Sequence, residues 1–295
     1  MSDLAIAVRG LRKSYGDFEA VRGIDFVVRR GEIFGLLGPN GAGKTTTVEI
    51  LEGYRQRTSG EVSVLGSDPG QRPRALRARF GIVLQSTGLY RHIRVREALS
   101  HFAAMYPDPR DVDEVIALTG LAGKEDAMAR TLSGGQLRRL DLALALVGDP
   151  ELIFLDEPTT GFDPAARRNA WETIGSMRDL GKTVLLTTHY LEEAQTLADR
   201  VAIIKDGRIV AEGAPRDLAA TDGATRYRIA YHNAGGELVE HVTDDPTTLL
   251  HELTAEALAH GERLDGLTVN RPSLEDVYLE LTAAPETHDE GVSVA

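Results

Sequence analysis

The chain of 295 residues contains no cysteine. This absence excludes disulfide bonds and thiolate metal sites, and it is consistent with a cytosolic protein. Eight histidines are present, but they do not show the spacing of metal ligands. The sequence therefore gives no sign of a transition-metal centre.

Long apolar runs are also missing. The longest, Leu142–Val147, is far too short to cross a bilayer. The acidic and polar start Met1-Ser2-Asp3 does not resemble a signal peptide. We expect no direct membrane insertion, so any attachment to a membrane would go through another protein.

Basic residues are fewer than acidic residues in this chain. The chain has 33 Lys and Arg residues against 45 Asp and Glu residues, a formal net charge of −12. Because such a field repels polyanions, this balance argues against a generic binder of nucleic acid or of anionic membranes. The 42% of hydrophobic residues suffices for a real core, and the length suggests one large domain with an appendage.

The most informative stretch is Gly38-Pro39-Asn40-Gly41-Ala42-Gly43-Lys44-Thr45, which fits the phosphate-binding loop pattern G-x-x-x-x-G-K-[ST] at every required position. An apolar run that is typical of a buried strand, Glu32–Leu37, precedes it, and a helix is predicted from Thr45. A glycine-rich turn before an ordinary helix is the simpler alternative. The complete pattern, placed between a strand and a helix, favours binding of a nucleoside triphosphate.

Each part of this loop has a physical use. The glycines allow successive N–H groups to turn toward phosphate oxygens, and the helix dipole favours the same anion. We expect Lys44 to reach the β and γ phosphates, the Thr45 hydroxyl to bind Mg²⁺, and Thr46 to donate to a phosphate oxygen.

Polar side chains follow three other predicted buried strands. Gln85 ends Phe80–Leu84, Asp156 and Glu157 end the run from Leu152, and His189 ends Thr183–Thr188. Strand alternation should separate the two carboxylates, with Asp156 suited to Mg²⁺ through water and Glu157 to polarising the attacking water. Taken singly, these would be a loop glutamine, solvated charges and a structural histidine. Together they should converge on one sheet edge.

Two further features could contact a nucleotide. Leu132-Ser133-Gly134-Gly135-Gln136 places a good N-cap and two glycines before a helix, a second anion-binding device unless it is a bare cap. Tyr15 lies in a turn after a strand from Leu4 and before strands at Phe18–Val21 and Ile24–Val28. Its ring could stack on a base, or it could be ordinary turn packing.

The remaining pattern divides the chain into regions. Residues from about 91 to 147 are mostly helical and are predicted to form a helical subdomain between strands, and residues 201–210 a hairpin turning on Asp206-Gly207. Beyond residue 220 we expect a small α+β appendage with strands at 226–231, 237–242 and 264–270 and helices at 246–260 and 273–281. Residues 283–295 should be a disordered tail.

The order of these motifs, continued by Gly161-Phe162-Asp163-Pro164, resembles the ATP-binding cassette of ABC transporters over about residues 4–219. Residues 132–164 and 271–282 are similar to the ATPase subunits of drug exporters of the daunorubicin-resistance type. The resemblance implies an α/β fold: an ABC-type P-loop ATPase core with an antiparallel β layer and a helical subdomain, plus the small C-terminal α+β appendage. The corresponding domains are 1–219 and 220–282.

The resemblance also implies a head-to-tail dimer that traps two ATP molecules. Ser133, Gly135 and Gln136 would then face the ATP held by the other chain's Lys44, with Asp163 as a contact across the dimer. Further roles implied are Glu157 as general base, His189 on the γ phosphate and water, Gln85 as Mg²⁺ sensor, and Tyr15 as adenine stacker. Intact chemical positions favour a homodimer.

The implied function is ATP hydrolysis that powers efflux, of an antibiotic or other drug, through a separate integral-membrane permease. The chain would be peripheral, on the cytoplasmic side of the membrane. One alternative is a soluble ABC ATPase that acts on ribosomes or DNA, but relatives of that kind carry two cassettes or a long coiled coil. A kinase or GTPase would leave the 132–136 motif and His189 without a purpose. A cassette for another substrate, importers included, stays open.

Overall fold

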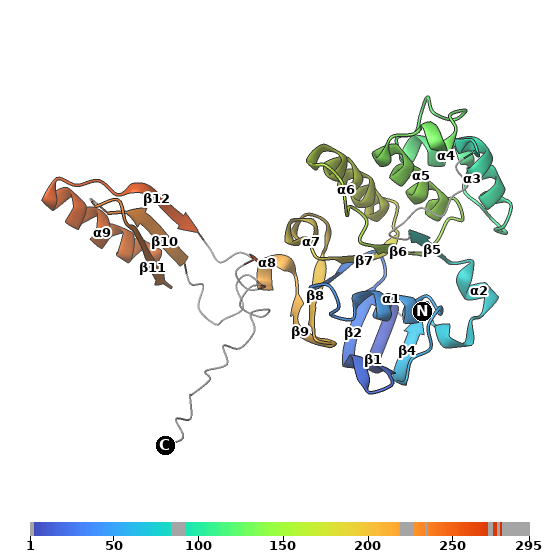
Figure 1. Ribbon diagram of the computed structural model, residues 1–295, viewed down its shortest axis with the longest axis horizontal. Coiled ribbons are helices and arrows are strands. Elements are labelled where there is room, and N and C mark those ends of the chain that lie inside the picture. The colour runs from blue at the N-terminus through green and yellow to red at the C-terminus, as the bar shows by residue number, and fades with distance from the viewer. Residues whose placement is uncertain are drawn as a thin grey trace, which may run out of the picture. The chain divides into compact units, whose positions relative to one another are not determined.

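The computed structural model describes residues 3–83, 92–218, 227–233, 235–270, 274–275 and 278. The chain divides into two compact units, residues 1–215 and 216–295. Each is described by itself, with the elements labelled in Figure 1.

A six-stranded sheet forms the centre of the first unit (Figure 1). Its strands, in spatial order, are β5 (Phe80–Val83), β6 (Leu152–Asp156), β7 (Thr183–Thr188), β3 (Ile33–Leu37), β8 (Arg200–Lys205) and β9 (Arg208–Gly213). All neighbours pair in parallel except β8 and β9, which form the predicted hairpin. Asp206 and Gly207 both have positive φ, 48° and 76°, as its two-residue turn requires.

The second sheet of this unit is antiparallel. It contains β1 (Leu4–Tyr15), β2 (Phe18–Arg29) and β4 (Ser59–Val64) in the order β2-β1-β4. The predicted antiparallel layer before the phosphate loop is thus confirmed. Helix α1 (Lys44–Leu51) contacts both β2 and β4 of this layer and β6 of the central sheet.

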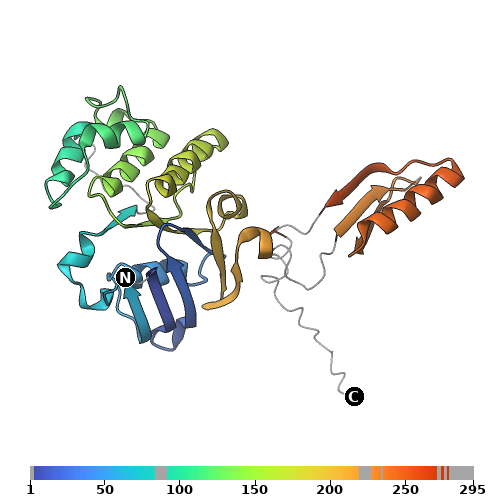
Figure 2. The same cartoon turned by 180° about the vertical axis from the view of Figure 1, so that it is seen from behind.

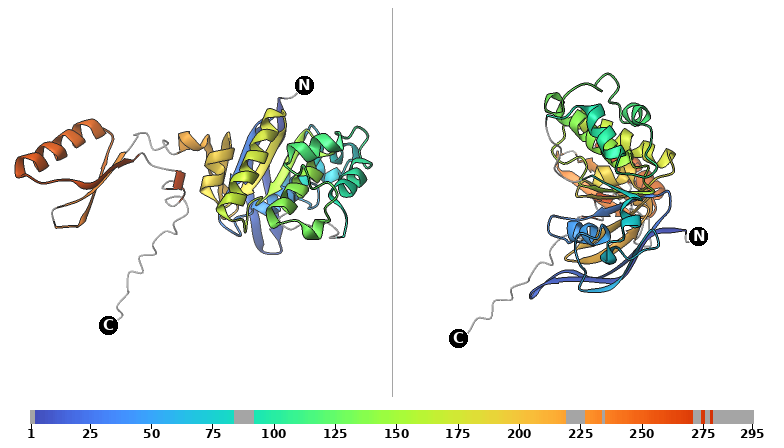
Figure 3. Two further views of the ribbon diagram at one scale, coloured as in Figure 1. Left: turned by 90° about the horizontal axis from the view of Figure 1, so that it is seen from above. Right: turned by 90° about the vertical axis from the view of Figure 1, so that its right-hand side faces the viewer.

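The helices of the first unit lie mainly on the opposite side of the central sheet from the antiparallel layer, as the views from behind and from the side show (Figures 2 and 3). They are α3 (Val95–Ala103), α4 (Val112–Leu118), α5 (Gly134–Leu146), α6 (Pro164–Asp179) and α7 (Leu191–Leu197). The helices predicted from Val95 and from Val112 are confirmed. The short helices are α2 (Arg74–Arg77), α8 (Pro215–Leu218) and the 3-10 turns Pro69–Gln71 and Ala129–Thr131.

Successive side chains of the central strands point to opposite faces of the sheet, so that they contribute to two hydrophobic cores. Phe34, Phe154 and Leu185 face the antiparallel layer and α1, whereas Ile153 and Val184 face the helices. Because both faces of the sheet are covered, its strands are continuous apolar runs, as expected for a parallel sheet. The sheet thereby presents its polar residues at the strand ends.

The second unit contains a three-stranded antiparallel sheet, β11 (Leu238–Thr243), β10 (Tyr227–His232) and β12 (Asp265–Asn270), in that order. Helix α9 (Pro246–His260) packs on β10. Asp245 caps this helix by accepting from the Thr248 N–H, and Gly261, with φ 68°, ends it. The expected α+β appendage is confirmed to residue 270, whereas the last helix lies largely, and the tail wholly, outside the described residues.

Candidate functional site

The phosphate loop joins the end of β3 to the start of α1, as predicted. Its glycines are required sterically. A Cβ at Gly38 would lie 2.3 Å from the Ile204 carbonyl oxygen, and Gly43, the N-cap of α1, has φ 104°. The loop therefore passes so close to β8 that only glycine fits at position 38 without a shift of the backbone.

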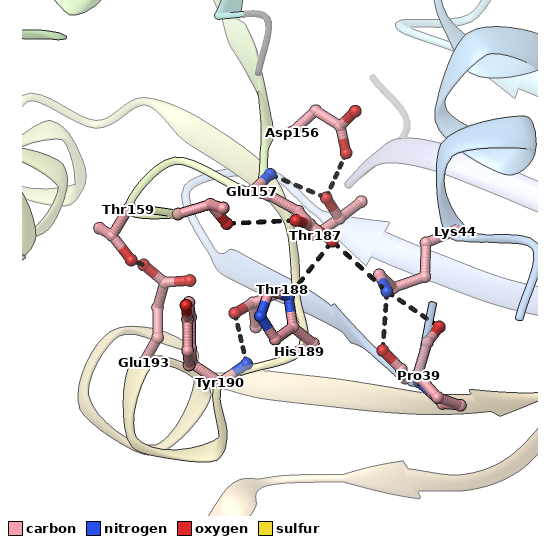
Figure 4. A network of polar contacts seen from close by, with 12 residues as sticks. Pro39, Lys44, Asp156, Glu157, Thr159, Thr187, Thr188, His189, Tyr190 and Glu193 are labelled. Atoms are coloured by element: carbon pink, nitrogen blue, oxygen red, sulfur yellow. Dashed lines mark hydrogen bonds and ion pairs between the residues drawn. The ribbon is translucent and has the colours of Figure 1, made fainter. Parts of the chain in front are cut away.

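Lys44 is the first residue of α1, and its side chain is only 4% exposed. Its ammonium donates to the carbonyl oxygens of Gly38 (2.7 Å) and Pro39 (3.1 Å) and lies 3.6 Å from Glu157 Oε1. Burial lowers the pKa of Lys44, and the nearby Glu157 carboxylate opposes this shift. The buried cation is thus held at the loop by both backbone and carboxylate oxygens (Figure 4).

The threonines after Lys44 differ in their surroundings. Thr47 is buried and donates to the Gly43 carbonyl oxygen, whereas Thr45 is exposed and Thr46 half-buried. Thr45 and Thr46 are therefore accessible to a ligand at the N-terminus of α1, where unpaired N–H groups favour an anion.

Thr187, which was not among the predicted site residues, connects the two carboxylates at the end of β6. Its hydroxyl donates to Asp156 Oδ1 (2.5 Å) and accepts from the Glu157 N–H (3.0 Å). The Thr187 side chain is fully buried on β7, directly beside Asp156 in the strand register. The pair of threonines that ends β7 after its apolar residues was the available signal.

Glu157 leaves the strand through an unusual backbone conformation, with φ 45°. Its Oε1 lies 3.3 Å from His189 Nδ1 as well as 3.6 Å from Lys44, and its Oε2 accepts from the Thr160 hydroxyl (3.1 Å). The two carboxylates do have different partners, as expected. The prediction that strand alternation separates them was wrong, because β6 ends at Asp156 and Glu157 has a left-handed backbone conformation. Figure 4 shows the partners of each carboxylate.

His189 follows β7 and packs against Tyr190, with ring centroids 4.1 Å apart. The Tyr190 ring in turn lies under the Arg167 guanidinium. The predicted convergence of strand ends is confirmed for the carboxylates and His189, whereas Gln85 lies outside the described residues.

The carboxylates of Asp156 and Glu157 both lie near the Lys44 ammonium, and a further buried carboxylate, Glu52, ends α1. Burial, with Asp156 and Glu49 nearby, raises the pKa of Glu52 to about 8. Burial and the neighbouring Glu157 carboxylate also raise the pKa of Asp156. A cation would offset this repulsion.

The residues present fit a magnesium ion that is bound mainly through phosphate and water. Within the described part of the chain, no group of three His, Asp or Glu residues could form an all-protein metal cage. Magnesium accompanying a nucleotide does not need one, since it retains waters and takes one or two protein ligands. The exposed Thr45 and the carboxylate of Asp156 are of the suitable oxygen type.

Ser133, Gly135, Gln136 and Asp163 come together in a second place. They line a hollow of about 520 Å³ between the N-termini of α5 and α6. Ser133 is the N-cap of α5, as predicted, and forms a reciprocal capping box with Gln136. Asp163 caps α6 by accepting from the Ala166 N–H (2.8 Å).

This hollow is separate from the phosphate loop, since its lining, among the described residues, includes none of residues 38–45. The capping box occupies the N–H groups of Ser133 and Gln136. The N–H groups of Gly134 and Gly135 belong to the first turn, which has no acceptors of its own within the helix. Each chain therefore carries two candidate anion-binding sites that do not meet within it.

Tyr15 ends β1 at the predicted turn and is 40% exposed. Lys13 Nζ lies 4.9 Å from its ring centroid, and the Arg55 guanidinium carbon 5.3 Å. An exposed ring flanked by cations suits both a base and its phosphates.

No helix in the described ranges has the length and apolar character needed to span a bilayer. The sheet edge, by contrast, brings together a buried lysine, carboxylates and a histidine from three segments that are far apart in sequence. Such a cluster is suited to binding a polyphosphate and activating water.

Comparison with known proteins gives a consistent result. The family described as "ABC transporter" matches residues 21–160. The Nod factor export ATP-binding protein I of Burkholderia lata is 40% identical over 305 residues, covering 94% of this chain and 96% of that protein. The daunorubicin resistance ATP-binding protein DrrA3 of Streptomyces coeruleorubidus is 36% identical over 307 residues, covering 96% and 97%.

Solved structures agree on the fold. An ATP-binding subunit of an ABC transporter covers 95% of this chain and all of its own, with a TM-score of 0.69 and 24% identity. The cbiO1 protein of Clostridium perfringens, part of the ABC transporter complex cbiONQ, has a TM-score of 0.66 and 28% identity, over 75% of this chain and 92% of its own. Full-length similarity to curated relatives, together with this sheet edge, leads to one conclusion: the chain belongs to the family of ABC transporter ATP-binding subunits, which bind ATP and hydrolyse it to power transport.

Proposed function

We propose that this chain is the ATPase subunit of an exporter and that it dimerises head to tail around two ATP molecules. The observation that carries the ATPase role is the position of Glu157, whose carboxylate lies between the ammonium of Lys44 and the ring of His189. An ATP γ phosphate that takes Lys44 as its partner would free Glu157 to accept a proton from the attacking water. His189 is near enough to hold the same phosphate and water.

The rest of the nucleotide site follows from the loop. N–H groups of residues 38–43 and the Thr46 hydroxyl would bind the phosphates, and Tyr15 would stack on the adenine. Magnesium, when bound by Thr45 and Asp156 together with Gln85, would neutralise phosphate charge. Thr187 would hold Asp156 in place for this purpose through its 2.5 Å hydrogen bond.

The dimer is proposed because the chain has two candidate anion-binding sites, the phosphate loop and the hollow at Ser133. Since Ser133 and Gly135 lie in a hollow that does not include the phosphate loop, a second chain would bring them to the γ phosphate. Asp163, in the same hollow, would lie at the seam. The dimerisation test is gel filtration of Glu157→Gln with ATP, with Lys44→Ala/Glu157→Gln as the matched control. A shift to the mass of a dimer in the first protein alone supports the proposal, and a monomer in both contradicts it.

The direction of transport is proposed from the relatives. Both the Nod factor export protein and the daunorubicin resistance protein match nearly the full chain. We propose an antibiotic or other drug as the cargo, moved through a separate integral-membrane permease. A cargo other than a drug is the alternative, since the Nod factor protein is 40% identical and the daunorubicin protein 36%.

The partner can be identified directly. Glu157→Gln protein with ATP would be used to capture partners from detergent-solubilised membranes of its own host, followed by mass spectrometry. We expect a polytopic membrane protein in stoichiometric amounts. Recovery of ribosomal or DNA-associated proteins alone would leave the ATPase chemistry intact and overturn the transport role.

A further inference from the structure

Glu193, on α7, is a carboxylate with no exposed surface. Its Oε1 accepts two hydrogen bonds, from the Thr159 hydroxyl (2.7 Å) and from the Trp171 indole N–H (3.1 Å). Its Oε2 is buried and has no hydrogen-bond partner among the described residues. Burying a carboxylate is costly, so this arrangement needs a reason other than packing.

The bond to Thr159 holds the segment that follows Glu157 (Figure 4). Thr159 is fully buried and lies two residues after Glu157. The preceding Pro158 is held from another side, because Arg138 Nε on α5 donates to its carbonyl oxygen (3.0 Å). Two helices thus bond directly to this segment, α5 through Arg138 and α7 through Glu193, and α6 supports Glu193 through Trp171.

The segment needs to be fixed because Glu157 has φ 45°. A residue with a side chain adopts this left-handed conformation only where its surroundings impose it, since it is strained. On the strand side, the Glu157 N–H donates to both Oγ1 (3.0 Å) and the carbonyl oxygen (3.2 Å) of Thr187. On the other side, the Pro158 carbonyl oxygen accepts from Arg138, and the Thr159 hydroxyl donates to Glu193.

We propose that Glu193 is a positioning residue for ATP hydrolysis, which acts by holding Thr159 so that Glu157 keeps its left-handed conformation and its carboxylate stays at Lys44 and His189. This rests on the proposed role of Glu157 as general base. Glu193 itself contacts neither Lys44 nor His189 through any bond described above. It acts on the rate of the chemical step and not on the affinity for ATP.

The test compares Glu193→Leu, Glu193→Gln and Thr159→Val, with Glu192→Gln, an exposed neighbour on the same helix, as the control. ATP turnover and KM are measured per folded protein. We expect Glu193→Leu and Thr159→Val to lower kcat about tenfold while KM for ATP stays within about threefold. Glu193→Gln should stay within about threefold of the wild type, because an amide oxygen can accept the same two bonds.

A role in stability alone would give a different result. It would lower the melting temperature without changing kcat per folded molecule, or it would raise KM in proportion. Either result, or a Glu193→Gln protein as slow as Glu193→Leu, overturns the proposal. If Glu193→Leu does not fold, Thr159→Val carries the test, since it only replaces the hydroxyl with a methyl group. The double variant should lose less than the product of the single losses, because both act through one bond.

If Glu157 is not the general base, the variants should give a different set of results. If Glu157→Gln hydrolyses ATP at a near-normal rate, the role of Glu157 is wrong whatever the Glu193 variants do. If Glu157→Gln is inactive and Glu193→Leu is unimpaired, only the positioning role is overturned.

Discussion

Glu157 Oε1 lies 3.6 Å from Lys44 Nζ, so the carboxylate proposed as general base pairs with the lysine proposed to bind the γ phosphate. Both side chains are largely buried, at 12% and 4% exposed. Because a phosphate would compete with Glu157 for the same ammonium, ATP binding and the freeing of the base are expected to be one event.

Tyr15→Ala should weaken ATP binding about five- to a hundredfold and leave kcat at saturating ATP nearly unchanged. The reason is the loss of base stacking, worth about 1–3 kcal/mol, on a ring that does not touch the reacting atoms. Titration with a fluorescent ATP analogue measures the affinity. Phe18→Ala is the matched control, since Phe18 is 60% exposed and pairs with Tyr15 at the end of the same hairpin. An unchanged affinity would return Tyr15 to ordinary turn packing.

Gly38→Ala should destabilise the protein by about 1–3 kcal/mol and abolish tight ATP binding. Its Cβ would lie 2.3 Å from the Ile204 carbonyl oxygen, so either the loop or β8 must shift. Thermal unfolding measures the loss. Gly134→Ala serves as the stability control, because a Cβ there meets nothing within 4 Å. Equal melting temperatures for the two variants would show that the close approach is not needed.

Glu52 should make the protein less stable as the pH rises. Its pKa is raised from 4.5 to about 8 in the folded state, chiefly by burial. Between these values the folded chain binds the proton and the unfolded chain does not, so unfolding becomes easier with increasing pH. The shift corresponds to a loss on the order of 5 kcal/mol, complete above pH 8.

Glu52→Gln removes this titration and keeps the shape of the side chain. The melting temperature of the variant minus that of the wild type should therefore grow from pH 5 to pH 9. The exposed Glu172→Gln on α6 is the control and should show a constant difference. A constant difference for Glu52→Gln as well would mean that Glu52 is not the buried group that titrates.

The sheet edge was predictable because the sequence signals were local. An apolar run followed by a polar residue predicts a buried strand and its end, and parallel strands end at one edge. For this reason Asp156 and His189 could be expected near Lys44, and the phosphate loop was recognisable from spacing alone. The N-cap of α5 at Ser133 and the turn at Asp206-Gly207 are local in the same sense.

The contacts that hold Glu157 in place, and its backbone conformation, could not be predicted from the sequence in the same way. Glu193 and Thr159 are 34 residues apart, and nothing in a helical stretch that reads Leu191-Glu192-Glu193-Ala194 distinguishes the buried glutamate from the exposed one. Likewise, the left-handed conformation of Glu157 has no sequence signal, since glycine is the residue that favours it. Both depend on tertiary contacts, which only the fold reveals.

The roles of several residues in the hollow at Ser133 and Asp163 also depend on a second chain. One chain shows that these residues share a hollow, but the ATP that they are proposed to contact would be bound by a partner. Sequence motifs and a single chain therefore lead to the dimer as a proposal that binding experiments must test.

The central claim is that Glu157 is the general base of ATP hydrolysis, and the most direct measurement is the turnover of Glu157→Gln at saturating ATP beside its affinity for ATP. We expect turnover to fall on the order of a hundredfold or more, as for loss of a general base, while ATP binding is retained. Glu192→Gln, exposed on α7, should behave as the wild type. Near-normal turnover of Glu157→Gln would contradict the assignment, and with it the account of how this sheet edge activates water.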